Sequence, residues 1–323
     1  MKPDPFKEMQ KAVDIIEDSP HPTNKIASCI FGKDQNNKDF SIAKTNYWPK
    51  IIADKLGKEI KIGNSSGTIH AETAAIMDCD HTNGASIAIT DPFCPNCAKN
   101  IAESGIKTIY IDHKGFKKDF WERREHVFNN MSMRIAEKAG ISVYEIWRKE
   151  EKIVPILEIP DDYIPIDENP IEINKIESAT KENFNNIIEM KSEFHAGRKH
   201  SIIIAKDLEE NIVSLTARAH PTIGYCYIDN KTEIENPQGK YSFILEPMNR
   251  LLINCRKQGL IPIKEYIYCS QVPTSREQVN MIGAGIDKVI INDKTKARDE
   301  HAFKAMALLI YKDIIKFKDH SKI

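Results

Sequence analysis

The spacing of apolar residues changes early in the chain from a helical to a strand-like pattern. Four apolar residues recur at helical intervals: Phe6, Met9, Val13 and Ile16. Ser19-Pro20 ends this pattern, and two β-branched stretches follow at 26–31 and 40–45, separated by the polar turn KDQNNKD. The pattern predicts an amphipathic helix over about 5–18 and then a β-hairpin.

Helical and strand patterns alternate through the rest of the first half. Strands are expected at SIAIT, KTIYID and ISVYEI. Helices are expected from about His70, from about Pro95 and over about 119–139. Such alternation is typical of an α/β fold in which helices cover both faces of a sheet, so we predict three α/β/α layers.

A proline-rich stretch near the middle of the chain divides it in two. Residues 151–175 carry four prolines, many acids and no helical period, as expected of an extended connector. The full length of 323 residues is sufficient for two ordinary domains. We therefore predict domains at 1–150 and 179–323, joined by a connector at 151–178.

The second half repeats the order of elements of the first. A helical segment, KENFNNIIEMKSEFHAG, precedes a hairpin, SIIIAKDLEENIVSLTARAHP. Short matches occur at corresponding places: Lys33-Asp34 with Lys206-Asp207, Pro49 with Pro221, Ser104-Gly105-Ile106 with Ala284-Gly285-Ile286, and Glu125-His126-Val127-Phe128 with Glu300-His301-Ala302-Phe303. Two unrelated α/β halves would share general patterns, but chance rarely supplies matched turns as well, so we predict an internal duplication.

Composition narrows the class of protein. A net charge of -1 with 29% charged residues lacks the basic excess of a dedicated nucleic-acid binder and argues against a polynucleotide substrate. The chain has no apolar run of signal-peptide or membrane-span length, so we expect a cytoplasmic protein without a membrane partner. Among seven cysteines, only Cys94 and Cys97 form a close pair, which indicates a metal or redox site.

The chemistry is concentrated in two short motifs. His70-Ala71-Glu72 is followed by Cys94-Pro95-Asn96-Cys97, the H-x-E and C-x-x-C arrangement of zinc nucleobase deaminases. One imidazole and two thiolates leave the fourth position of a tetrahedral zinc open for water. The carboxylate of Glu72 is then close enough to take a proton from that water without being a ligand.

Each motif alone has an ordinary explanation. A single C-x-x-C is also found in redox pairs and in structural zinc sites, and H-x-E alone carries almost no information. Their order favours the catalytic interpretation, because a hairpin, a helix carrying HAE, a strand and a helix opening on C-x-x-C follow one another.

Residues 5–147 closely resemble the cytidine and deoxycytidylate deaminase superfamily, most clearly in GTIHAETAAI and ITDPFCPNCAKNIAESGIKTIYI. The resemblance implies a cytidine-deaminase-like fold, Zn²⁺ as cofactor and a role for each of six residues. These are zinc binding by His70, Cys94 and Cys97, proton transfer by Glu72, a sugar contact by Asn46, and a contact of the base carbonyl with the backbone of Ala71.

The resemblance also indicates the substrate. The alanine after the second cysteine, Ala98, resembles the sequence of nucleotide deaminases at this position. Phe93 before the first cysteine and Thr73-Ala74 after HAE depart from the residues usual in the superfamily. We expect deoxycytidylate or a related pyrimidine nucleotide or nucleoside. The alternatives are guanine or another purine, and a non-catalytic protein that keeps zinc as a structural clamp. A homodimer of duplicated chains is a further expectation.

The second half lacks the motifs. FILEPMNRLL stands in place of TIHAETAAI, which puts Leu245 at the position of His70 and Pro247 at that of Glu72. VPTSREQ stands in place of FCPNCAK, with Thr274 and Glu277 at the cysteine positions. We therefore expect no metal site in the second half and hypothesise that it packs on the first as an internal pseudo-dimer partner.

Overall fold

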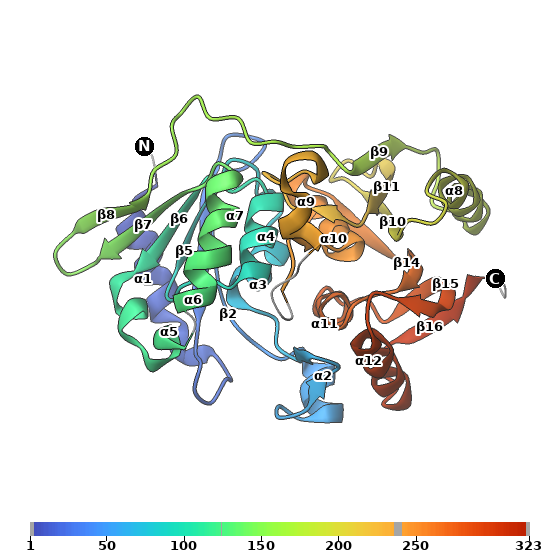
Figure 1. The fold of residues 1–323 in the computed structure, drawn as a ribbon, viewed down its shortest axis with the longest axis horizontal. Coiled ribbons are helices and arrows are strands. Elements are labelled where there is room, and N and C mark those ends of the chain that lie inside the picture. Colours follow the sequence, from blue (N-terminus) through green and yellow to red (C-terminus); the bar gives the residue numbers. More distant parts are fainter. Residues whose placement is uncertain (1–2, 124, 236–240, 321–323) are drawn as a thin grey trace.

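The computed structural model describes residues 3–123, 125–235 and 241–320 (Figure 1). The first sheet contains β1 (Ala27–Lys33), β2 (Asp39–Thr45), β5 (Ser86–Ile89), β6 (Thr108–Asp112), β7 (Ser142–Trp147) and β8 (Lys152–Leu157). Its strand order is β2-β1-β5-β6-β7-β8, with β1 antiparallel to both neighbours and β5, β6 and β7 parallel. None of the described helices is long and apolar enough to cross a membrane.

Alternating side chains of the first sheet bury two different faces. Cys29 and Phe31 pack in a cluster with α1 (Pro5–Asp14), whereas Ile30 between them packs in a cluster on the other face. Three helices cover that other face: α3 (Ala71–Asp78), α4 (Pro95–Glu103) and α7 (Met133–Lys138). The predicted α/β/α layering is therefore present in the first half.

The second sheet has the same arrangement. Its strands are β9 (Ile171–Lys175), β10 (His200–Lys206), β11 (Ile212–Arg218), β14 (Ile261–Val272), β15 (Lys288–Ala297) and β16 (Lys316–Asp319). Its helices are α8 (Lys181–Phe194), α10 (Pro247–Lys257), α11 (Ser275–Gly283) and α12 (Glu300–Tyr311). The five strands β11-β10-β14-β15-β16 match β2-β1-β5-β6-β7 in order and direction, so the duplicated fold is confirmed.

The two hairpin turns agree in atomic detail. The carboxylate of Asp34 accepts hydrogen bonds from the backbone N–H groups two and four residues later, and the carboxylate of Asp207 does the same. The residue three positions after each aspartate has a positive φ, 62° at Asn37 and 65° at Glu210. The matched Lys-Asp pairs in the sequence therefore mark the same turn.

Two segments differ from the sequence expectation. The helix expected over 119–139 is interrupted: α5 (Asp119–Glu122) and α6 (Glu125–Val127) precede a π-helical turn, Phe128–Ser132, and then α7. The wider π turn accompanies the packing of Phe128, whose ring lies edge-on to Phe93 with centroids 5.3 Å apart.

The proline-rich connector is extended, as predicted, but its two ends are strands. β8 adds to the edge of the first sheet beside β7, and β9 adds to the second sheet beside β11. The chain between them passes over the top of the molecule in Figure 1. We propose that the boundary between the two halves lies within residues 158–170.

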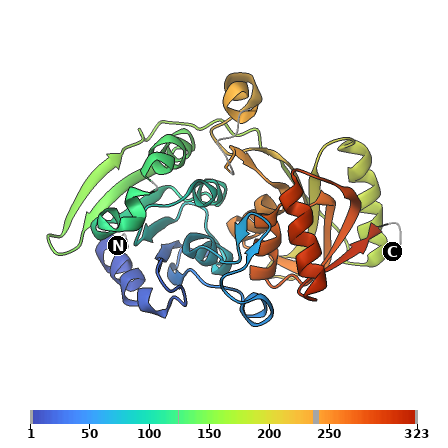
Figure 2. The ribbon, with the colours of Figure 1, turned by 60° about the horizontal axis from the view of Figure 1, so that its bottom comes forward.

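Each half extends a segment, here called an arm, that packs against the core of the other half. The first arm, residues 46–69, contains α2 (Lys50–Leu56), β3 (Lys61–Ile62) and β4 (Ser65–Ser66). The second arm, described over residues 219–235 and 241–245, contains α9 (Tyr227–Glu235), β12 (His220–Pro221) and β13 (Ile244–Leu245). Apolar side chains of the first arm belong to the core of the second half: Trp48, Ile52, Leu56, Ile62 and Ile69. Figure 2 shows α2 beside the second half. Tyr225, Ile234 and Phe243 of the second arm reciprocally join the core of the first half.

A buried ion pair joins the halves between α4 and α10. Arg250 is fully buried, and its Nη1 donates to a carboxylate oxygen of Glu103 at 2.5 Å. Its Nη2 donates to the carbonyls of His220 and Pro221 in the second arm. The other oxygen of Glu103 accepts from the amide of Asn254 at 2.6 Å. The two charges are therefore paired inside the interface between the halves, while the buried Nε of Arg250 has no hydrogen-bond partner among the described residues.

Replacement of Arg250 by Met should lower the free energy of unfolding by about 3–5 kcal/mol, because it leaves the buried carboxylate of Glu103 without a cation. Urea denaturation of the full chain measures this. Arg134→Met is the matched control, since Arg134 also pairs across the halves, with Glu233, but at partly exposed positions where about 0–1 kcal/mol is expected. Equal effects of the two substitutions would contradict the central role of Arg250.

Candidate metal centre and active site

Two adjacent helices begin with the residues of the two motifs. His70 is the N-cap of α3 and Cys94 is the N-cap of α4. Pro95 occupies the first position of α4, where its fixed φ favours helix initiation and its missing N–H costs nothing. Cys97 lies in the first turn of α4, so both thiols are at the positive end of the helix dipole.

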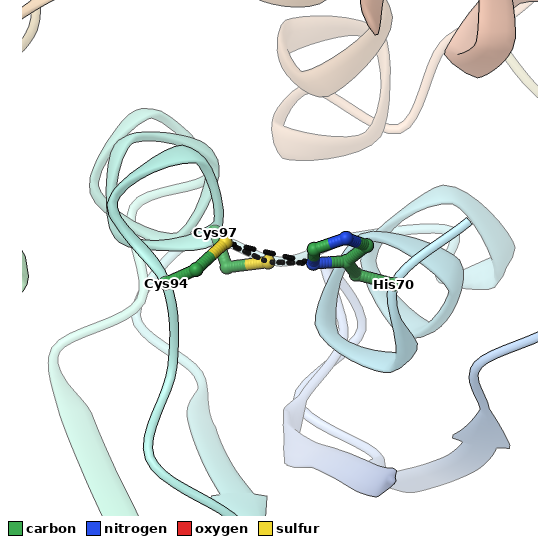
Figure 3. Close-up of side chains that lie close together, drawn as sticks. All are labelled: His70, Cys94 and Cys97. Carbon is green, nitrogen blue, oxygen red and sulfur yellow. Dashed lines mark hydrogen bonds between the residues drawn. The ribbon is translucent and has the colours of Figure 1, made fainter. Parts of the chain in front are cut away.

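The three side chains converge in a geometry that fits zinc (Figure 3). His70 Nδ1 lies 3.2 Å from Cys97 Sγ and 3.5 Å from Cys94 Sγ, and the two sulfurs are 3.6 Å apart. A tetrahedral zinc with ordinary Zn–S and Zn–N lengths implies about 3.5 Å between N and S and about 3.8 Å between two S. Among the described residues, this is the one cluster of three or more metal-ligating side chains with atoms this close.

A hydrogen bond fixes the two helices relative to each other. The amide of Asn100 on α4 donates to the hydroxyl of Thr73 on α3 at 3.0 Å, and both residues are buried. The second half repeats this contact, since the amide of Asn280 on α11 donates to Asn249 on α10 at 2.9 Å. The contact holds the imidazole and the thiols at a constant separation.

A cavity of about 180 Å³ borders these ligands, and we name it the substrate cavity. His70, Ala71, Glu72, Cys94 and Asn46 all line it, so five of the six predicted site residues face one space. Cys97 lies behind, 1% exposed. Glu72 is 3% exposed, and burial raises the pKa of its carboxyl above the usual range, against the effect of the nearby His70.

Asn46 follows β2, as predicted, but its side chain already serves the loop before β1. Its Oδ1 accepts hydrogen bonds from the Ser19 hydroxyl at 2.7 Å and from the Ile26 backbone N–H at 3.0 Å. Its Nδ2 donates to the Asn24 carbonyl at 2.9 Å. Asn46 therefore shapes one wall of the substrate cavity, and its contact with a sugar stays a prediction.

Sequence reasoning missed His21. His21 lines the substrate cavity, whereas Trp48 lies behind it, with the two rings stacked at 5.1 Å. An isolated histidine in the loop SPHPT has no periodic pattern that could have identified it. Phe93, the departure before the first cysteine, points into the core at 1% exposure, and Pro92 lines the cavity instead.

Comparison with known proteins gives the same assignment. Residues 6–113 match the family model described as "Cytidine and deoxycytidylate deaminase zinc-binding region". This third of the chain is thus similar to the zinc-binding region of the cytidine and deoxycytidylate deaminase superfamily. The predicted resemblance is thus confirmed.

Individual relatives cover parts of the chain. "ComE operon protein 2" of Bacillus subtilis (strain 168) is 33% identical over 93 residues, which are 28% of this chain and 43% of that protein. A dCMP deaminase from the cyanophage S-TIM5, solved in complex with dCMP and dUMP, is 20% identical, with a TM-score of 0.31 over 45% of this chain and 99% of its own. Its apo form gives a TM-score of 0.29 over 45% of this chain and 100% of its own, again at 20% identity.

In the second half, the structural counterpart of His70 is Glu246, which corrects the sequence alignment by one residue. Glu246 is the N-cap of α10, as His70 is of α3, so Leu245 and Pro247 do not hold the positions assigned to them. Sequence alignment alone could not show that a β-bridge precedes each helix. The bridge pairs Tyr47 with Ile69 in the first half and His220 with Leu245 in the second. The positions of Thr274 and Glu277 agree with the prediction, because Thr274 is the N-cap of α11.

A lysine ammonium takes the place of a metal among these counterparts. Lys199 Nζ lies 2.6 Å from a carboxylate oxygen of Glu246 and 2.9 Å from one of Glu277. Although burial alone lowers it, these carboxylates raise the pKa of Lys199 above its usual range. Glu277 also accepts from the Met248 backbone N–H and from Thr274, so it links α10 to α11. The second half thus keeps a positive charge between two helix starts, and its described residues contain no cluster of three metal-ligating side chains.

Lys199→Met should destabilise the chain by about 3–5 kcal/mol, because the buried carboxylate of Glu277 would lose its cation. Urea denaturation at neutral pH tests this. Lys206→Met at the far end of the strand that follows Lys199 is the control, since its pair with Glu210 is partly exposed and should contribute about 0–1 kcal/mol. A Lys199 variant as stable as the control would show that the ammonium does not hold this cluster together.

Proposed function

We propose that the chain is a zinc-dependent hydrolytic deaminase whose substrate is deoxycytidylate or a related pyrimidine nucleotide or nucleoside. The observation that carries the proposal is the convergence of His70, Cys94 and Cys97 beside a buried carboxylate, Glu72, that is not part of the ligand cluster. All but Cys97 border the same cavity. The match to the family model supports the same chemistry.

The donor set suits a catalytic zinc. His70 would supply an imidazole nitrogen and the two cysteines would supply thiolates, which leaves one tetrahedral position for water or substrate. When bound, zinc supplies Lewis acidity that generates a nucleophile from water near neutral pH. A structural clamp would instead require a fourth protein ligand, and among the described residues the cluster has three.

Glu72 is the proposed proton carrier. It is the second residue of α3, lines the substrate cavity and is shielded from bulk solvent. Its carboxylate would accept a proton from the attacking water and return protons to the ring nitrogen and to the leaving amine, so that ammonia departs. The backbone of Ala71 and the side chain of Asn46 are proposed to orient the base and the sugar.

One tightly bound zinc per chain is expected from metal analysis of the purified protein. The double variant Cys94→Ala/Cys97→Ala should lose it, because one imidazole alone holds zinc weakly. Cys255→Ala is the control, since Cys255 is also buried but lies in the core of the second half. Two zincs per chain, or full retention in the double variant, would contradict the assignment.

Glu72→Gln should keep the fold and the zinc but lose about 100- to 10,000-fold in turnover, because it removes proton transfer and no ligand. Ammonia release from a panel of pyrimidine and purine bases, nucleosides and nucleotides measures this and identifies the substrate. Zinc-loaded protein without ammonia release from any member would refute the proposed activity. Near-normal turnover of the variant would assign proton transfer to another residue.

A further inference from the structure

A second cavity, of about 240 Å³, lies between the halves, and we name it the central cavity. Equivalent positions of the two halves line it in pairs: His70 with Glu246, Cys94 with Thr274, and Asn96 with Arg276. The duplication therefore places the centre of the first half and its altered counterpart around one common space.

Two cations from opposite halves border this cavity through reciprocal contacts. Lys99 on α4 donates to the carbonyls of Ser242 and Ile244 in the second arm, at 2.9 and 2.8 Å. Arg276 on α11 donates through Nη1 to the carbonyl of Thr68 in the first arm at 2.7 Å. Its Nη2 contacts the Ser66 carbonyl and hydroxyl at 3.4 and 3.3 Å.

These two cations have no carboxylate partner within the described part of the chain. The ion pairs of the described residues include neither Lys99 nor Arg276, although Lys99 is only 5% exposed. Carbonyl dipoles offset part of the desolvation of a cation but do not neutralise its charge. Arg298, which also lines the cavity, is already paired with Glu246. Counting all charged lining residues, four cations (Lys61, Lys99, Arg276 and Arg298) face two carboxylates (Glu246 and Asp299), so the central cavity has an excess of positive charge that a bound anion would balance.

The central cavity opens on the same atoms as the substrate cavity. Ser66, His70 and Cys94 line both spaces, so a ligand group in one cavity is adjacent to a group in the other. Arg276 contacts Ser66 directly, at this shared wall. The two cavities are therefore adjacent at the metal ligands, and Arg276 borders the one that does not contain Glu72.

We propose that the central cavity is a phosphate site next to the active site, in which the second half supplies Arg276 as the residue that selects nucleotides over nucleosides. This inference rests on the proposed function for the identity of the base. A guanidinium matches a phosphate through paired charge-assisted hydrogen bonds, and the contacts with the first arm involve only the two Nη atoms of Arg276. Lys99 adds a second positive charge from the first half.

The equivalent residue of the first half indicates why this site is asymmetric. Asn96 stands where the second half has Arg276, and it carries no charge. At this pair of positions the guanidinium therefore comes from the second half, and it borders a cavity that His70 and Cys94 of the first half also line. The half without metal ligands then has a direct role in substrate selection, in addition to its role in packing.

Calorimetric binding to the inactive Glu72→Gln protein tests the site. Deoxycytidylate should bind about 10- to 100-fold more tightly than deoxycytidine. Adding Arg276→Gln should remove most of this preference, because the affinity for deoxycytidylate should fall by a larger factor than the affinity for deoxycytidine. Arg134→Gln is the matched control, because Arg134 also contacts the opposite half but does not line the central cavity. With Glu72 intact, Arg276→Gln should lower kcat/KM for the nucleotide by a larger factor than kcat/KM for the nucleoside, mainly through a higher KM for the nucleotide.

The remaining outcomes distinguish a nucleotide phosphate from the phosphate of another ligand. They also distinguish failure of the phosphate site from failure of the proposed deaminase function. Loss of inorganic phosphate binding in Arg276→Gln supports the site. If deoxycytidylate does not compete with that phosphate, the site serves a separate phosphorylated ligand and the selection role is overturned. If Arg276→Gln weakens the binding of nucleotide and nucleoside by the same factor, Arg276 has only a structural role and the inference is overturned. Phosphate binding that depends on Arg276, without any deamination of cytosine compounds, would instead refute the proposed function and leave the site standing.

Discussion

Each half of the chain completes its core with an arm from the other half. The arm between the second strand and the following helix leaves its own sheet and returns only at the helix start, which in the first half is His70 and in the second is Glu246. The position of the metal ligands therefore depends on a segment that is folded against the opposite half. The ion pair of Arg250 with Glu103 and the contacts of Lys99 and Arg276 with the arms all stabilise this exchange.

A positive charge between the starts of two helices is common to both halves, although its source differs. In the first half the donors are soft, and the distances fit zinc. In the second half, Lys199 extends from a backbone position equivalent to Ile26, because Ile26 and Lys199 accept equivalent hydrogen bonds from Asn46 and Ala219. A salt bridge with two carboxylates maintains the helix arrangement there without offering a Lewis acid. The second half thus keeps the same helix arrangement with a different set of side chains between the helix starts.

The sequence predicted those features that depend on local pattern. Hairpins, helix starts and the spacing of the ligands follow from periodicity, turn residues and the H-x-E and C-x-x-C motifs, and the structure brings His70, Cys94 and Cys97 together as expected. Features that depend on tertiary contact were missed. His21 and Arg276 lie in no motif and reach the site only through loop closure and the packing of the halves. The alignment of the second copy slipped by one residue because only the β-bridge before α10 fixes where that helix begins.

The edge strands at the two ends of the connector have a consequence for how the protein behaves in dilute solution. Because β8 and β9 anchor both ends of the connector, the second half is held near the first at a high effective concentration. A pair of separate subunits would dissociate on dilution and lose any cavity that they share. In this chain the central cavity is a property of a single molecule, so its occupancy depends on the concentration of ligand and not on that of the protein. Covalent linkage also allows the two halves to differ in sequence. Lys199, for example, lies in the second half only, where the first half has Ile26, and the metal ligands of the first half are unaffected.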